Sequence, residues 1–351
     1  MGLYQADLEK KTYKKPGILT VGILYSIVVI LFILVGYRVQ KRGFYSGVLI
    51  TEVILILLPP LLTLYYFKYD IKKVLRLNRI GILNLFLIFC IMIFSIPVVG
   101  LFNLANIWLV RYIFGKTIVV QPPIATSYGG LLLNILAIGL SAGVCEEVFF
   151  RGVIQRGLEK LGAATSIILT AFLFSIMHVY FEKIFGTFLL GALIGFIVYR
   201  TNSLFGGIFA HFVNNTIGVV IMFAANKLAD IAKMSGIEPN TDTELIFDMF
   251  NQMPMEQLIA IIIAWAFIIL FSVTILAALI YALVKNTSHN VEKMQKIEAI
   301  NKIEGERATK AGLLAFLPGI MFLSVLYFLE GMTLMGIESP ITGIIHKLLG
   351  V

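Results

Sequence analysis

The feature that most constrains this chain is a series of long apolar runs along nearly its whole length. A helix needs about 20 apolar residues to cross the hydrocarbon of a bilayer, and most of these runs reach that length. Only 14% of the residues are charged and 59% are hydrophobic, whereas a soluble domain carries about 25% charged residues. The sequence therefore predicts an all-α polytopic transmembrane helical bundle of about eight to nine spans. The expected spans are 17–37, 45–67, 80–103, 128–150, 163–181, 185–199, 204–224, 258–284 and 311–328.

The basic residues predict how the bundle sits in its membrane. The formal net charge is +8, but Lys and Arg lie mostly between the apolar runs, where they set topology and contact anionic headgroups. This distribution indicates a lipid bilayer as partner and no nucleic acid. With a cytoplasmic N-terminus, about twice as many basic residues face inside as outside, as the positive-inside rule requires. Abundant Ile, Lys and Asn are compatible with an AT-rich bacterial genome, so we expect an integral multi-pass protein of a bacterial plasma membrane.

The segments between the runs divide the chain into three regions. Residues 1–127 hold N-terminal spans and a basic amphipathic linker at 68–79, residues 128–224 hold a polar cluster described below, and residues 225–351 hold the rest. In this last region we expect an acidic loop, a span, a charged segment and a C-terminal hydrophobic segment. Glu292 and Lys296 stand at i, i+4 spacing, as do Glu298 and Lys302, which predicts a solvated cytoplasmic helix in the charged segment.

Two adjacent carboxylates, Glu146 and Glu147, end an apolar run. An ionised side chain at the centre of a bilayer costs about 2.5–3.5 kcal/mol on insertion scales, so such residues need partners or a wet cavity. Arg151 lies four residues after Glu147 on the same helical face and is its predicted ion-pair partner. Glu146 then remains as the unpaired carboxylate, suited to accepting and returning a proton.

Two histidines join this pair from other runs. The chain has four histidines, and only His178 and His211 lie in predicted spans. If the helices turn near Gly162, Glu146 and His178 lie level with each other, each about 24 Å from the turn. Asn215 follows His211 by four residues and shares its helical face.

Other roles compete for these residues. Polar side chains also join helices by hydrogen bonds without any chemistry, although three runs that each contribute polar groups favour a site. The aromatic residues among them are expected to pack in the core, with substrate lining as the alternative: Phe149, Phe150, Phe174 and Phe212. Gly191 and Gly195 stand at GxxxG spacing, which predicts a close helix crossing.

Three ordered motifs resemble the CPBP intramembrane proteases. These are Glu-Glu-x-x-x-Arg at 146–151, Phe-x-x-x-His at 174–178 and His-x-x-x-Asn at 211–215. The family includes the Rce1-type CAAX prenyl endopeptidases and the bacterial Abi or bacteriocin self-immunity proteins. The resemblance covers roughly residues 128–224, which we therefore expect to be the catalytic core.

The resemblance implies hydrolysis of a peptide bond in a membrane-associated peptide or protein substrate. By analogy, Glu146 with His178 activates a water, His211 with Asn215 stabilises the oxyanion, and Glu147 with Arg151 supports the helix. A metal-free site is favoured, because the sequence lacks the local two-ligand helix motif of most zinc proteases. The alternative is zinc bound by Glu146, His178 and His211.

Two further hypotheses belong to other functional classes. The first is a non-enzymatic partner or immunity protein on the same fold, which would retain its phenotype when the acidic and histidine residues are changed. The second is a proton-coupled transporter that uses the intramembrane Glu and His as a relay. Nothing in the sequence resembles the inverted repeat of such transporters.

Overall fold

The computed structural model describes residues 13–117, 123, 125–236, 252–304 and 310–337. These residues form helices without any strand, which confirms the predicted all-α bundle. Within this described part, eight helices are long and apolar enough to cross a membrane: Ile18–Arg42, Phe44–Tyr66, Ile82–Phe114, Tyr128–Leu161, Phe181–Thr201, Leu204–Met234, Met255–Asn286 and Leu317–Leu334. A ninth apolar helix, α11 (Ala163–Ile176), is shorter, with 14 residues, and packs along α12 (Ile184–Thr201).

Several of the membrane-spanning helices contain π-helical turns. The first combines α2 (Ile18–Leu31), η1 (Phe32–Gly36) and α3 (Tyr37–Arg42), and the second combines α4 (Phe44–Ile50), η2 (Thr51–Leu57) and α5 (Leu58–Tyr66). The fourth is built from α8 (Tyr128–Asn134), η3 (Ile135–Ser141), α9 (Ala142–Glu147), η4 (Val148–Ile154), α10 (Gln155–Leu158) and the 3-10 turn η5 (Glu159–Leu161). The remaining elements are α6 (Ile71–Val74), α7 (Ile82–Phe114), η6 (Phe181–Lys183), α12 (Ile184–Thr201), α13 (Leu204–Met234), α15 (Met255–Asn286), α16 (Ser288–Glu304), α17 (Lys310–Leu314) and α18 (Leu317–Leu334).

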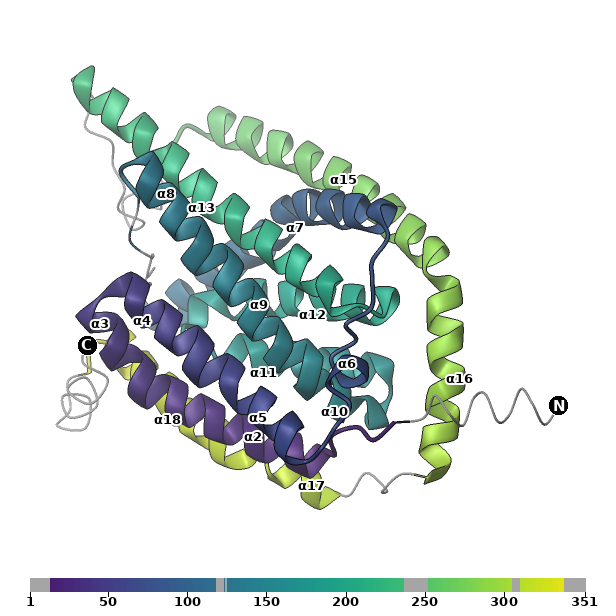
Figure 1. The fold of residues 1–351 in the computed structure, drawn as a ribbon. Helices are drawn as coiled ribbons and strands as arrows, with labels where there is room; N and C mark the ends of the chain where they lie inside the picture. The colour runs from purple at the N-terminus through teal and green to yellow at the C-terminus, as the bar shows by residue number, and fades with distance from the viewer. Residues whose placement is uncertain (1–12, 118–122, 124, 237–251, 305–309, 338–351) are drawn as a thin grey trace.

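The helices of the 128–224 region lie at the centre of the bundle. Figure 1 shows α9, α11, α12 and α13 between two flanks, with α2 and α18 on one side and α7 and α15 on the other. Gly162 has a φ of +102°, which lets the chain turn from η5 into α11. The central helices are therefore surrounded by spans from both ends of the sequence.

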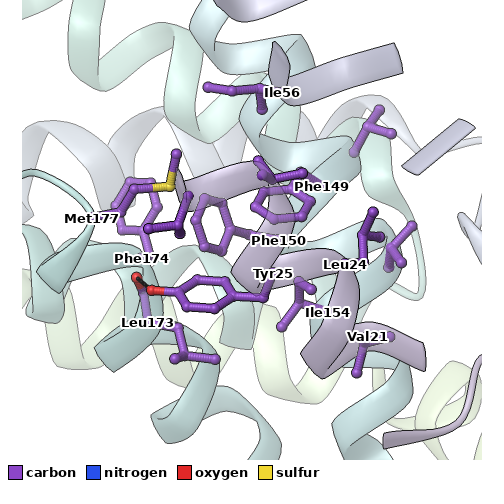
Figure 2. Packing of buried hydrophobic residues seen from close by; sticks show 14 of the residues in the cluster. Val21, Leu24, Tyr25, Ile56, Phe149, Phe150, Ile154, Leu173, Phe174 and Met177 are labelled. Carbon is purple, nitrogen blue, oxygen red and sulfur yellow. Dashed lines mark hydrogen bonds between the residues drawn. The ribbon is translucent and has the colours of Figure 1, made fainter. Parts of the chain in front are cut away.

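Aromatic residues fill the core between the central helices and α2. Phe149 and Phe150 are buried and pack edge to face, and Phe150 packs in the same way on Phe174 (Figure 2). The hydroxyl of Tyr25 in α2 donates to the carbonyl of Leu173 at 2.9 Å. Three of the four aromatic residues noted in the sequence thus pack in the core, whereas Phe212 is half-buried.

Two predicted boundaries were wrong. The loop expected from residue 225 begins later, because α13 continues to Met234; most of the acidic stretch, 237–251, lies outside the described residues. The first span, expected to end at residue 37, continues as helix to Arg42. In both cases residues that follow an apolar run extend the helix beyond the hydrophobic stretch. The basic linker at 68–79 is not a span, as predicted, and contains one short helix, α6.

The charged segment 285–310 contains the predicted helix, α16. The ammonium of Lys296 donates to the carboxylate of Glu292 at 2.9 Å, as the i, i+4 spacing predicted. This hydrogen bond holds the pKa of the Glu292 carboxyl below its usual range. The side chains of Glu298 and Lys302 lie outside the described residues.

Candidate active site

The predicted ion pair of Glu147 and Arg151 is present and completely buried. The guanidinium Nη1 of Arg151 lies 2.6 Å from Oε1 of Glu147, and neither side chain is exposed to solvent. Arg151 also donates to the carbonyl of Gly191 in α12 at 2.9 Å and lies 4.7 Å from the centroid of the Phe174 ring. A Cβ on Gly191 would lie 3.1 Å from Phe174, so the glycine permits this close crossing of α11 and α12.

His211 joins the same carboxylate from α13. Its Nδ1–H donates to Oε1 of Glu147 at 2.9 Å, because an ionised carboxylate can only accept. Its Nε2 lies 3.9 Å from Oε2 of Glu146. Glu147 therefore orients the imidazole of His211 so that Nε2 faces Glu146, in addition to neutralising Arg151.

Two small residues bring α13 close enough for this contact. A Cβ on Gly143 of α9 would lie 3.3 Å from the backbone nitrogen of Phe212, and one on Gly139 of η3 would lie 2.9 Å from Oγ1 of Thr216. Gly139 and Gly143 stand at GxxxG spacing, as do Gly191 and Gly195. Only the second pair was predicted from the sequence to mark a close helix crossing.

The two adjacent glutamates have different surroundings. Glu147 is fully buried, whereas 17% of the Glu146 side chain is exposed. Both belong to α9, and successive helical positions point in different directions, so the two carboxylates have different neighbours. Glu146 is thus the carboxylate of this cluster that a water or a substrate can reach.

His178 lies just beyond α11, in the connection to η6. Its Nδ1–H donates to the carbonyl of Phe174 at 3.0 Å, since a carbonyl only accepts. The Phe174 ring packs edge to face on both imidazoles, with centroid distances of 4.9 Å to His178 and 6.0 Å to His211. In both histidines Nδ1 is occupied, which leaves the Nε2 atoms for chemistry.

The predicted pairing of Glu146 with His178 differs from the contacts in the structure. Among the described residues, the histidine in contact with Glu146 is His211, and no hydrogen bond or ion pair joins Glu146 to His178. The helical register places the two residues level, but α11 ends at Ile176, and the following turn directs His178 toward Phe174.

Asn215 lies one turn after His211 and is half-buried. Its Nδ2 donates to the carbonyl of Ile138 in η3 at 2.9 Å, and its Oδ1 accepts from Asn214 at 3.1 Å. A carboxamide nitrogen carries two hydrogens, so the second N–H of Asn215 remains a donor.

A third carboxylate, Glu52, was missed in the sequence analysis. It lies in η2, which packs against α9, and it is 6% exposed. It interacts electrostatically with Glu146 and Cys145, and its Oε2 has no hydrogen-bond partner among the described residues. The signal was available, because Glu52 is the one charged residue in the predicted span 45–67.

The zinc alternative does not fit this arrangement of side chains. Across the part of the chain that the structure describes, no three His, Cys, Asp or Glu side chains gather in a way that could hold a metal ion, and this includes Glu146, His178 and His211. We therefore derive no step through a metal.

Residues 128–217 match the family model described as type II CAAX prenyl endopeptidase Rce1-like. No curated protein and no solved structure shows significant similarity to the chain. The matched segment begins with α8 and ends within α13, so it contains every predicted site residue and excludes Glu52. The resemblance predicted from the three motifs is thus confirmed. This chain is an integral membrane protein whose residues 128–217 match the Rce1-like family of CAAX prenyl endopeptidases, a family of proteases.

Proposed function

We propose that this protein is an intramembrane endopeptidase that hydrolyses a peptide bond in a membrane-associated peptide or protein. The observation that best supports the proposal is the accessible carboxylate of Glu146 next to His211, an imidazole that a fully buried carboxylate orients. This arrangement lies inside the segment that matches a protease family. An accessible general base beside a preorganised donor is what peptide hydrolysis requires.

In the proposed reaction, Glu146 and His178 bind and activate one water. The carboxylate of Glu146 takes a proton from the water, while the free Nε2 of His178 accepts a hydrogen bond from the other O–H. The resulting hydroxide attacks the carbonyl carbon of the scissile bond. When the tetrahedral intermediate collapses, the C–N bond breaks and the proton on Glu146 passes to the leaving amine.

His211 and Asn215 stabilise the oxyanion in this proposal. Asn215 donates its second amide N–H. His211 donates from Nε2 in the form that carries a proton on both ring nitrogens, with its Nδ1–H held by the carboxylate of Glu147. Arg151 pairs with Glu147 and holds its carboxylate in place. Removing one such donor costs about 100- to 1000-fold in kcat in well-studied hydrolases.

We also propose a substrate delivered from the bilayer, either a CAAX-type C-terminus or a peptide of the bacteriocin-processing kind. The N-terminus and the charged α16 are proposed to face the cytoplasm of a bacterial cell, in line with the positive-inside bias.

The test uses purified protein in liposomes with two quenched fluorescent peptides, one with an isoprenylated C-terminal cysteine motif and one without the isoprenoid. We expect hydrolysis of at least one peptide, with losses above about 100-fold in Glu146→Gln and His178→Ala. Glu292→Gln serves as a control, because this side chain is exposed on α16. Wild-type hydrolysis by a folded Glu146→Gln variant would refute the proposal. If cells that carry this variant were still protected against a bacteriocin, that result would instead favour the hypothesis of a non-enzymatic immunity protein.

A further inference from the structure

The turn that carries His178 is held by residues from outside the matched segment. The chain leaves α11 at Ile176 and enters η6 at Phe181, with His178 between them. Val179, the next residue, has a φ of +59°. A β-branched residue in this left-handed region is an outlier that persists only where its surroundings impose it.

The backbone of Phe181, two residues after Val179, is hydrogen-bonded to two other helices. Its N–H donates to both carboxylate oxygens of Glu330 in α18, at 3.1 and 3.2 Å. Its carbonyl accepts from Nδ2 of Asn106 in α7 at 2.6 Å. Both backbone groups of Phe181 are therefore fixed by side chains from two other helices, 149 and 75 residues away in the sequence.

The ring of Phe181 is fixed in the same way. It packs on Phe114 of α7 with a centroid distance of 5.1 Å and on Tyr327 of α18 with a centroid distance of 5.0 Å. A Cβ on Gly331 would lie 3.2 Å from Phe114, so α18 approaches α7 closely here. This approach brings Glu330 within reach of the Phe181 backbone.

The start of the turn is attached to α12. The hydroxyl of Ser175, near the end of α11, donates to the carbonyl of Ile184 at 2.7 Å and accepts from the hydroxyl of Thr187 at 3.2 Å. The turn thus has one end fixed within the matched segment and the other end fixed by α7 and α18. His178 lies between these anchors, and its ring position depends on both.

We propose that Glu330 and Asn106 are positioning residues that hold the turn in the conformation that aims Nε2 of His178 at the water beside Glu146. This role rests on the proposed function. In this proposal the flanking helices α7 and α18 help to position His178, although neither belongs to the segment that matches the family. The hydrogen bonds to Phe181 restrain the backbone two residues after Val179, whose left-handed conformation needs support from its surroundings.

The first test measures kcat and KM of Glu330→Ala, Glu330→Gln and Asn106→Ala with the peptide that the wild type cleaves. A misplacement of about 1 Å costs on the order of 100-fold, so we expect kcat to fall by about 10- to 100-fold in Glu330→Ala with KM little changed. Glu330→Gln keeps a carbonyl acceptor and should recover part of the loss. Ser324→Ala is the matched control, because this exposed α18 hydroxyl donates within its own helix.

A double-mutant cycle separates positioning from a general loss of structure. If Glu330 acts through His178, adding Glu330→Ala to His178→Ala should leave the residual kcat unchanged. Multiplied losses in the double variant, or a wild-type kcat in the folded Glu330→Ala variant, would overturn the proposal.

A second readout does not need hydrolysis. The chain has only four histidines, so selective ¹⁵N labelling gives a simple ring spectrum in which His178→Ala assigns one signal. We expect the His178 signal to shift or split in Glu330→Ala and to stay unchanged in Ser324→Ala. An unchanged His178 signal in Glu330→Ala would overturn the positioning role. A shifted signal in a protein that cleaves neither peptide would refute the protease function and leave the contact between α18 and the turn supported.

Discussion

Glu146 and Glu147 are neighbours in the sequence, yet neutralising them should have opposite consequences for stability and activity. Glu147 is completely buried and accepts from both Arg151 and His211 at one oxygen, at 2.6 and 2.9 Å. In Glu147→Gln the guanidinium of Arg151 keeps the Gly191 carbonyl and the Phe174 ring but loses its counter-charge.

The magnitude follows from the burial of the pair. Removing one partner of a buried ion pair costs about 3–5 kcal/mol, because the other charge is left uncompensated. At about 2 °C per kcal/mol for a chain of this size, the Tm should fall by about 6–10 °C. Glu146 is 17% exposed, and the nearest ring nitrogen of His211 is 3.9 Å from its carboxylate. Glu146→Gln should therefore change the free energy of unfolding by less than about 1 kcal/mol, while it abolishes hydrolysis.

The assay is thermal unfolding of both purified variants in detergent, followed by intrinsic fluorescence and compared with the wild type. A second measurement combines Glu147→Gln with Arg151→Met, which removes both charges. The loss of unfolding free energy in the double variant should be smaller than the sum of the losses in the two single variants. The difference, which is the coupling energy, should be about 0.5–3 kcal/mol. A Tm of Glu147→Gln within 2 °C of wild type, or a larger loss in Glu146→Gln, would refute this interpretation of the two carboxylates.

Three substitutions and one dialysis experiment test the surroundings of the site. In Gly207→Ala the new Cβ would lie 2.4 Å from Val198 and 2.9 Å from Oε2 of Glu147, so we expect a loss of about 1–3 kcal/mol. Gly218→Ala, with nothing within 4 Å, should be silent in the same unfolding assay. Glu52→Leu removes a buried oxygen that lacks a partner and should raise the Tm while lowering kcat, because strained or unpaired groups at sites trade stability for activity. A lower Tm with unchanged kcat would contradict a role for Glu52. Exhaustive dialysis against a strong chelator should leave hydrolysis intact, whereas loss restored specifically by zinc would show that the metal-free mechanism is wrong.

Much of the candidate site followed from local sequence rules. The ion pair of Glu147 and Arg151 depends on helical spacing alone, and charges inside apolar runs mark residues that need partners. The three motifs pointed to the same residues that the family model covers. These signals are visible in one sequence because each depends on residues a few positions apart or on a charge in an apolar context.

Contacts between distant helices were not accessible in this way. The pairing of Nε2 of His211 with Glu146 depends on how α13 crosses α9 at Gly143. The approach of Glu52 depends on the packing of η2 on α9, and no spacing rule connects residues almost a hundred positions apart.

The sequence alone determined that this chain spans a membrane many times and which polar residues it places there, because the hydrophobic effect and backbone hydrogen bonding act on each segment independently. Only the tertiary structure decided which of those polar residues are buried as partners of one another and which remain accessible. Glu147 became the buried partner of Arg151 and His211, and Glu146 stayed accessible. The turn of His178 came to depend on Glu330. The physical reason is that packing over the whole bundle selects how helices cross. Two side chains one turn apart on a helix are neighbours because of their spacing in the sequence. The partner of a side chain across a helix interface depends instead on the crossing.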